Sequence, residues 1–219
     1  MKTFIEYFNV ILTGDRDASR LAAREVRKLL YSSQGGDDKY KEIKNLVNNA
    51  PDEYAKISEE WRQENFVMAI SVIYFLHSRK NQPDFLFLWL FQMLLHKNGY
   101  IRHAAVRMIE HEIGPLTEHI RFPNKKFSSI RKLISEQSDH ILFEMFMNLM
   151  NLIKYLWKSS YKKYKYVSSL PSGPYKSVQM VLGRLEEDCG KDYMARMKDD
   201  FRKYSIMNTA PLPRFRSEA

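Results

Sequence analysis

Apolar residues recur along most of this chain at intervals of three and four positions, the spacing that buries one face of an α-helix. Glycine and proline, eight of each, fall mainly between the periodic segments, where they end helices and form turns. No stretch alternates apolar and polar residues for long enough to predict a β-strand. The pattern therefore indicates an all-α fold, with helices predicted near 2–12, 16–32, 37–48, 51–60, 63–79, 83–97, 100–112, 127–136, 138–164, 174–188 and 190–204.

Several residues at the ends of these segments carry boundary signals. Asp15 and Asp84 precede predicted helices, where a carboxylate can accept hydrogen bonds from free main-chain amides. Gly99 lies between two predicted helices, where a left-handed turn would favour glycine. Gly114 and Pro115 follow the segment at 100–112 and predict the end of that helix.

Two of the predicted helices share a pattern. Residues 19–30, SRLAAREVRKLL, and residues 101–112, IRHAAVRMIEHE, each carry an arginine, one further residue, and then two alanines. Both resemble the second helix of a HEAT or armadillo-type repeat. The resemblance implies that the alanine pairs allow close helix packing, and that Arg20 and Arg102 take the position of an arginine near the start of the inner helix.

The two segments lie 82 residues apart, about twice the usual HEAT period of ~40 residues. A degenerate unit can therefore lie between them, and the segment at 63–79 is the candidate. The resemblance covers residues 10–116, and a non-repetitive helical array is the alternative.

We therefore expect antiparallel helix pairs over residues 1–120, stacked as a HEAT-like α-α superhelix. A basic helical subdomain over 121–207 is expected to pack on this stack, or to continue it as one domain. Residues 208–219 contain two prolines and no periodicity, and are predicted to be a flexible tail.

Positive charge is concentrated in the C-terminal half. The formal net charge is +9, and residues 119–185 carry twelve basic side chains against three acidic ones. Residues 154–176, called the Lys–Tyr segment below, interleave six lysines with six aromatic residues and contain no acidic residue. Lysines attract phosphates and aromatic faces stack on unpaired bases, so this segment is the clearest functional signal in the sequence.

The candidate partner-binding residues come mainly from this segment. Trp61 is added because charged residues flank it on both sides, and Arg102 because of the repeat pattern. The set is Lys154, Lys158, Tyr161, Lys162, Lys163, Tyr164, Lys165, Arg102 and Trp61.

Three interpretations of the Lys–Tyr segment stay open. It can bind nucleic acid, or it can bind an acidic protein or an anionic membrane surface. Alternatively, its tyrosines can seat the preceding helix on the core while the lysines reach water. The acidic-rich residues 184–200 follow directly and can neutralise it.

No catalytic motif or cofactor-binding motif occurs, and the spacing of the histidines favours no metal site. The single cysteine, Cys189, excludes an intrachain disulfide and fits a reducing compartment. No apolar run approaches the ~20 residues that cross a bilayer. We therefore expect a cytoplasmic protein.

The function expected is a non-catalytic helical-repeat module that binds a macromolecule through a groove and a basic, aromatic-rich surface. A protein is the expected partner and nucleic acid the alternative; the oligomeric state stays open. A second class is a nucleic-acid-binding or nucleic-acid-processing protein of the DNA-alkylation-repeat type. That resemblance implies aromatic and carboxylate side chains in the same groove as the lysines. A third is a small-molecule-binding bundle, with the Met/Phe-rich residues 142–153 as a pocket wall.

Overall fold

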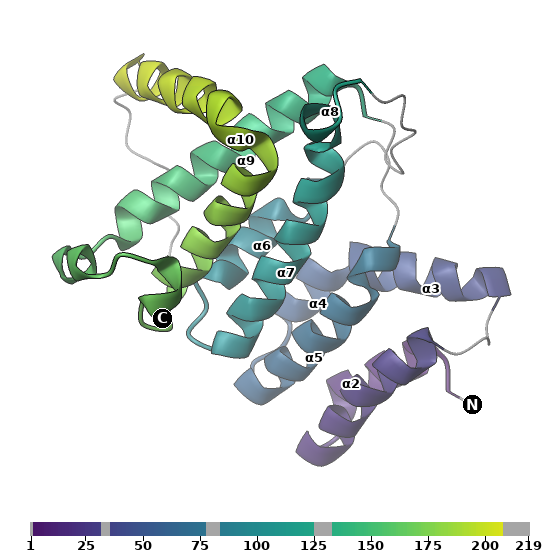
Figure 1. Ribbon diagram of the computed structural model, residues 1–219. Helices are drawn as coiled ribbons and strands as arrows, with labels where there is room; N and C mark the ends of the chain where they lie inside the picture. Colours follow the sequence, from purple (N-terminus) through teal and green to yellow (C-terminus); the bar gives the residue numbers. More distant parts are fainter. Residues whose placement is uncertain (1, 32–35, 78–83, 125–132, 208–219) are drawn as a thin grey trace.

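The computed structural model of this protein describes residues 2–31, 36–77, 84–124 and 133–207, with the backbone alone at 36, 37 and 204–207. Every regular element within those ranges is helical, and none is a β-strand. The protein is all-α, as the sequence predicts (Figure 1). Its elements are α1 (Phe4–Thr13), α2 (Arg16–Leu30), α3 (Gly36–Asn48), α4 (Ala50–Ala55), α5 (Glu60–Ile73), η1 (Tyr74–Leu76), α6 (Phe87–Leu94), α7 (Gly99–Leu116), α8 (Glu118–Arg121), α9 (Ser135–Leu156), η2 (Ser159–Lys163), η3 (Val167–Ser169) and α10 (Pro174–Met207).

Helices α1 and α2 form a hairpin whose ends follow local sequence rules. Thr3 caps α1, because its hydroxyl accepts from the Glu6 amide while the Glu6 carboxylate accepts from the Thr3 amide. Asp15 caps α2 by accepting from the Ala18 amide at 2.8 Å, which confirms the predicted start. Phe8 of α1 and Val26 of α2 are then buried between the helices and the rest of the core.

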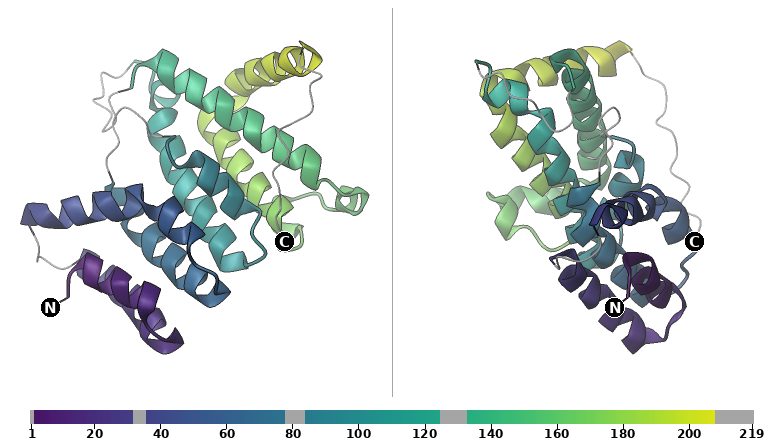
Figure 2. Two further views of the ribbon diagram at one scale, coloured as in Figure 1. Left: turned by 180° about the vertical axis from the view of Figure 1, so that it is seen from behind. Right: turned by 90° about the vertical axis from the view of Figure 1, so that its right-hand side faces the viewer.

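Four helices follow one another across the molecule: α2 packs on α5, α5 on α7, and α7 on α10. Each also packs against a partner of its own, which is α1 for α2, α3 and α4 for α5, α6 for α7, and α9 for α10. Figures 1 and 2 show this succession from both sides. One set of buried apolar side chains extends through the arrangement from Phe4 to Phe201.

The alanine pairs lie where the helices meet. Ala22 of α2 is buried and Ala23 partly buried, while Ala104 and Ala105 of α7 are both buried. A methyl side chain takes little room between neighbouring helices, so these positions can lie in the helix contacts.

Helix α10 is interrupted at Gly190, whose φ of 76° lies in a region that other residues rarely adopt. Two helical stretches, one on each side of this glycine, match the two helices predicted at 174–188 and 190–204. Helix α9 ends at Leu156, whereas the sequence predicted that it continued to 164. The chain becomes extended at Trp157 and forms short 3₁₀ turns instead.

Three predicted boundary signals are wrong. The Asp84 side chain does not cap α6; its main-chain carbonyl accepts from the Phe87 amide. Gly99 is the first residue of α7 and is not left-handed, because Asn98 supplies the cap. Pro115 lies inside the last turn of α7, so the helix continues to Leu116. Most of the helix predicted at 127–136, and the tail at 208–219, lie outside the described residues.

Candidate functional site

A row of arginines follows one face of α2. Arg16, Arg20, Arg24 and Arg27 recur about once per helical turn, so all four side chains project from the same side. The opposite face carries Ala22 and Val26 and is buried. All four arginines are exposed, and within the described part of the chain none forms an ion pair or a hydrogen bond with another side chain. This set is called the arginine row below.

The arginine row forms one wall of a groove of about 1410 Å³. Helices α3, α5 and α7 and the 3₁₀ turn η1 form the rest of it, and this groove is called the arginine groove below. Six cationic and two anionic side chains line it, namely Arg16, Arg20, Arg24, Arg27, Lys39 and Arg107 against Asp17 and Glu64. The groove therefore carries an excess of positive charge, which favours a polyanionic ligand.

Aromatic side chains from several elements also line the arginine groove, namely Tyr31, Tyr40, Trp61, Phe75 and Tyr100. Three of these are well exposed, Tyr31 at 78%, Tyr40 at 54% and Tyr100 at 65%. The guanidinium of Arg62 lies 4.4 Å from the centre of the Trp61 ring and holds that ring in place. The groove thus combines cations with flat rings.

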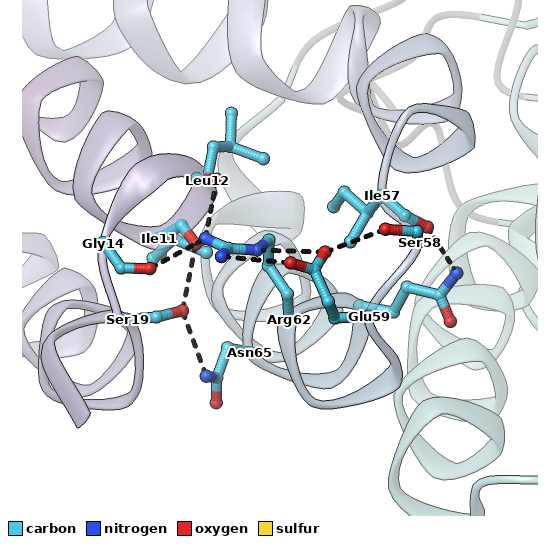
Figure 3. Close-up of polar contacts among 10 residues, drawn as sticks. Ile11, Leu12, Gly14, Ser19, Ile57, Ser58, Glu59, Arg62 and Asn65 are labelled. Carbon is cyan, nitrogen blue, oxygen red and sulfur yellow. Dashed lines mark hydrogen bonds and ion pairs between the residues drawn. The ribbon is translucent and has the colours of Figure 1, made fainter. Parts of the chain in front are cut away.

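One arginine fixes the position of α2 against α5. The Arg62 Nη1 donates to the main-chain carbonyls of Ile11, Leu12 and Gly14 at 3.1, 2.6 and 3.0 Å (Figure 3). These carbonyls close α1, whose last turn has no further amides to pair with. The charge of Arg62 therefore satisfies the helix end and ties the α1–α2 turn to α5.

A second, uncharged link runs beside it. The Asn65 amide donates to the Ser19 hydroxyl at 3.1 Å, and that hydroxyl donates to the Ile11 carbonyl at 3.0 Å (Figure 3). Ser19 is completely buried. Together the two links set the spacing between α2 and α5, which both line the arginine groove.

The side of the groove formed by α7 is fixed by carboxylates of α5. Glu64 accepts from the side-chain amide of Asn98 at 2.8 Å, and Asn98 caps α7. Glu60 pairs with Lys97 at 2.8 Å, and the hydrogen bond from Lys97 is the main cause that lowers the pKa of Glu60. Glu64 therefore has a structural role, because it holds the start of α7 against α5.

The structure separates the two residues predicted outside the Lys–Tyr segment. Trp61 is partly buried and lines the arginine groove. Arg102 is only 6% exposed, and its Nη1 donates to the carbonyls of His96 and Lys97, in the turn between α6 and α7, at 2.7 Å each. Burial lowers the pKa of Arg102. Arg102 therefore has contacts within the chain, which favour a structural role over the predicted contact with a partner.

The Lys–Tyr segment lies between α9 and α10 and at their ends, and its lysines do not line the arginine groove. Tyr161 stacks on Tyr175 with ring centres 4.5 Å apart, and Trp157 packs on both rings. These contacts support the interpretation that the aromatic residues attach the segment to the core.

The predicted lysines of this segment, Lys154, Lys158, Lys162, Lys163 and Lys165, are exposed, and Tyr164 is partly buried. Three of the lysines lie over aromatic rings, at 4.3 Å for Lys154 on Phe201, 5.1 Å for Lys163 on Tyr164 and 5.3 Å for Lys165 on Tyr166. Tyr166 itself is 62% exposed, so this surface can still contact another molecule.

The arginine groove holds aromatic and carboxylate side chains together, the combination that the DNA-alkylation-repeat resemblance implies. They lie beside arginines, however, and not beside the predicted lysines. Residues 142–153 were predicted as the wall of a small-molecule pocket. Within them, Met145 and Phe146 of α9 are completely buried, and Phe146 packs on Phe201 of α10. The arginine groove is lined by other helices.

The arginine row does not stand out in the sequence, because Asp17 and Glu25 lie among the arginines and cancel much of the charge averaged over this segment. The four-residue spacing in RDASRLAAREVRKLL was the available signal. Arg20 was instead assigned to the arginine position of the repeat, but it is exposed in the arginine groove, and Arg62 of α5 closes α1.

Within the described residues, no three His, Cys, Asp or Glu side chains are grouped so that they could hold a metal ion. The same part of the chain has no helix that is both long and apolar enough to cross a membrane. Comparison with known proteins finds no protein-family model, no curated protein and no solved structure that matches this chain.

Proposed function

We propose that this protein is a non-catalytic, HEAT-like binding module that holds a strand of nucleic acid in the arginine groove. The observation that carries the proposal is the arginine row: four exposed cations, one per helical turn, along the wall of a groove that aromatic rings also line. The succession of α2, α5, α7 and α10, each with a partner helix, supports the HEAT-like description.

Phosphate groups suit this arrangement better than the scattered carboxylates of an acidic protein. A guanidinium offers two parallel N–H donors that match the oxygens of a phosphate, and a row of them follows a backbone of regularly spaced charges. The exposed rings of Tyr31, Tyr40 and Tyr100 offer faces on which unpaired bases can stack. An acidic peptide would use the arginines but not this set of rings.

The proposal includes no reaction. Glu64 is the carboxylate of α5 that lines the groove, and it is already held by Asn98 at the start of α7. Substitution of Glu64 would weaken the contact between α5 and the start of α7. Glu64 therefore positions two walls of the groove.

The test is fluorescence anisotropy of labelled oligonucleotides, titrated with the protein over a series of salt concentrations. The variant Arg20→Gln/Arg24→Gln removes two cations of the arginine row. The matched control Lys191→Gln/Arg196→Gln removes two exposed cations of α10, away from the groove. The plot of log affinity against log salt has a negative slope, and each lost phosphate contact makes it shallower by ~0.7 on a single strand. The first variant should therefore reduce the magnitude of the slope by about 1.4.

Binding by the parent protein, a lower slope in the arginine variant and an unchanged slope in the control would support the proposal. Equal slopes in the two variants would contradict it, because the charge would then act from anywhere on the surface. Displacement of the oligonucleotide by polyglutamate at the same charge concentration would point instead to an acidic protein.

A further inference from the structure

A second hollow of about 680 Å³ adjoins the arginine groove and shares two residues with it, Phe75 and Arg107. It lies between α7 and α10, with Val167 of η3 at its edge, and is called the end pocket below. Its volume is in the range of pockets that hold small organic groups. Because the two hollows share a border, a strand in the groove can place one of its groups in the end pocket.

Hydrogen-bond acceptors predominate among the uncommitted groups of the end pocket. Glu110 is partly buried, and its side-chain carboxylate forms no hydrogen bond and no ion pair with any of the described residues. Gln179 uses its Nε2 to donate to the Tyr175 hydroxyl at 3.1 Å, which leaves its amide oxygen as an acceptor. Glu187 is only loosely paired, with 3.9 Å between its carboxylate and Arg184.

The cations of the end pocket are placed differently. Arg184 is paired with Asp188 at 3.1 Å, so much of its charge is neutralised. Arg107 lies over the Phe75 ring at 5.7 Å, on the border with the arginine groove. Burial is the main cause that raises the pKa of Glu110, while the charges of Arg184 and His103 act in the opposite direction. A ligand group that donates hydrogen bonds would compensate for this burial.

Flat and apolar surfaces complete the end pocket. Phe75 is held edge-on by His111, with ring centres 4.7 Å apart, and Met180 and Val167 line the pocket as well. The pocket thus joins an aromatic ring, apolar contacts and acceptors, next to a cation that can hold a phosphate. A heteroaromatic ring that carries N–H donors fits this chemistry.

We infer that the end pocket receives a nucleobase with an exocyclic amino group from the strand in the arginine groove, and so makes binding selective for amino-bearing bases over thymine or uracil. The inference rests on the proposed function. Glu110 and Gln179 accept from the amino group, Phe75 supports the ring, and Arg107 holds the neighbouring phosphate.

The experiment compares binding of two oligonucleotides of equal length, one of deoxycytidine and one of deoxyuridine. The two bases are both pyrimidines of the same size, so backbone charge is matched; cytosine carries an amino donor at C4 and an acceptor at N3, whereas uracil carries a carbonyl at C4 and an N–H donor at N3. The parent protein should bind the cytosine strand roughly five- to tenfold more tightly, as a well-formed base contact provides. Glu110→Leu and Gln179→Leu each remove an acceptor and should each bring the ratio of the two affinities close to one, with little effect on the uracil strand.

Asp192→Asn is the control for the lost negative charge, because Asp192 is exposed on α10 and lies outside the end pocket. It should keep the ratio of the parent protein. Using two variants protects the test against a folding defect in one, and circular dichroism shows which variants are folded.

The possible results separate the two proposals. Salt-dependent binding without selectivity in the parent protein, or selectivity that survives both pocket variants, would overturn the end-pocket inference and leave the proposed function standing. Absence of binding to either strand at low salt would overturn the proposed function, and the inference with it.

Discussion

Arg62 on α5 donates a hydrogen bond to the main-chain carbonyl of Leu12 at 2.6 Å, across fifty residues of sequence. The same guanidinium reaches the carbonyls of Ile11 and Gly14, so a single side chain closes α1 and joins the first helix pair to α5. Because α2 follows directly after Gly14, this contact also sets where the arginine row faces α5.

Replacing Arg62 with alanine should therefore destabilise the protein. Three carbonyls lose a charged donor, and hydrogen bonds to charged groups are worth about 1.5–3 kcal/mol, so we expect a loss of about 2–3 kcal/mol. The measurement is the free energy of unfolding in urea. Arg24→Ala is the control, since Arg24 is exposed, and it should change that free energy by less than ~0.5 kcal/mol. Similar losses in both variants would show that the Arg62 contacts do not hold the fold.

The break in α10 gives a second prediction. Gly190 has a φ of 76° and a ψ of 169°, a conformation that is costly for any residue with a Cβ. Gly190→Ala should lower the free energy of unfolding by about 1–3 kcal/mol. Gly183→Ala is the matched control in the same helix, because a Cβ at either glycine meets no other atom within 4 Å. It should stabilise the protein by ~0.5–1 kcal/mol, as expected for helical alanine over glycine.

Opposite signs for the two glycine variants would locate the cost in the backbone conformation of Gly190. Destabilisation of equal size in both would contradict this account.

The partly buried phenol of Tyr54 makes the free energy of unfolding depend on pH in the alkaline range. Burial, with a smaller effect from Glu60, raises the pKa of Tyr54 to about 12 from its ordinary value of 10.0. A raised pKa means that the folded state favours the neutral phenol. The contribution is therefore complete below pH 10.0 and is lost as the pH rises toward 12, because only the unfolded chain ionises readily.

Tyr54→Phe should remove this part of the alkaline destabilisation. The difference in unfolding free energy between variant and parent should be constant below pH 10.0 and should shift in favour of the variant between pH 10.0 and 12. Urea unfolding over that pH range measures it. A constant difference throughout would show that Tyr54 titrates alike in both states.

The sequence was sufficient for the helices whose ends carry local signals. Asp15 and the apolar spacing of residues 19–30 define α2 without help from the rest of the chain. The limits of α7 and α9 were harder to predict, because tertiary contacts decide them. Pro115 is tolerated inside α7, in its last turn, and Trp157 leaves α9 where its ring packs on Tyr175.

The residues of the candidate site also differ in whether local sequence or tertiary contacts determine their roles. Trp61 stood out in the sequence by its charged neighbours and does line the arginine groove. The opposite roles of Arg20 and Arg102 could not be predicted from two helices that share the same arginine and alanine-pair pattern. Arg102 donates to main-chain carbonyls of the turn that precedes its own helix. At the end of α1 and in the turn that precedes α2, Arg62 of α5 donates to such carbonyls, and Arg20 stays exposed.

The proposed function places the ligand at the arginine row and not at the Lys–Tyr segment. The most direct test compares Arg20→Gln/Arg24→Gln/Arg27→Gln with Lys162→Gln/Lys163→Gln/Lys165→Gln, since each variant removes three exposed charges. Anisotropy with a labelled single strand over a salt series gives both affinity and slope. We predict that the arginine variant reduces the magnitude of the slope by about 2, while the lysine variant changes it little. A loss confined to the lysine variant would place the site in the Lys–Tyr segment and contradict the account.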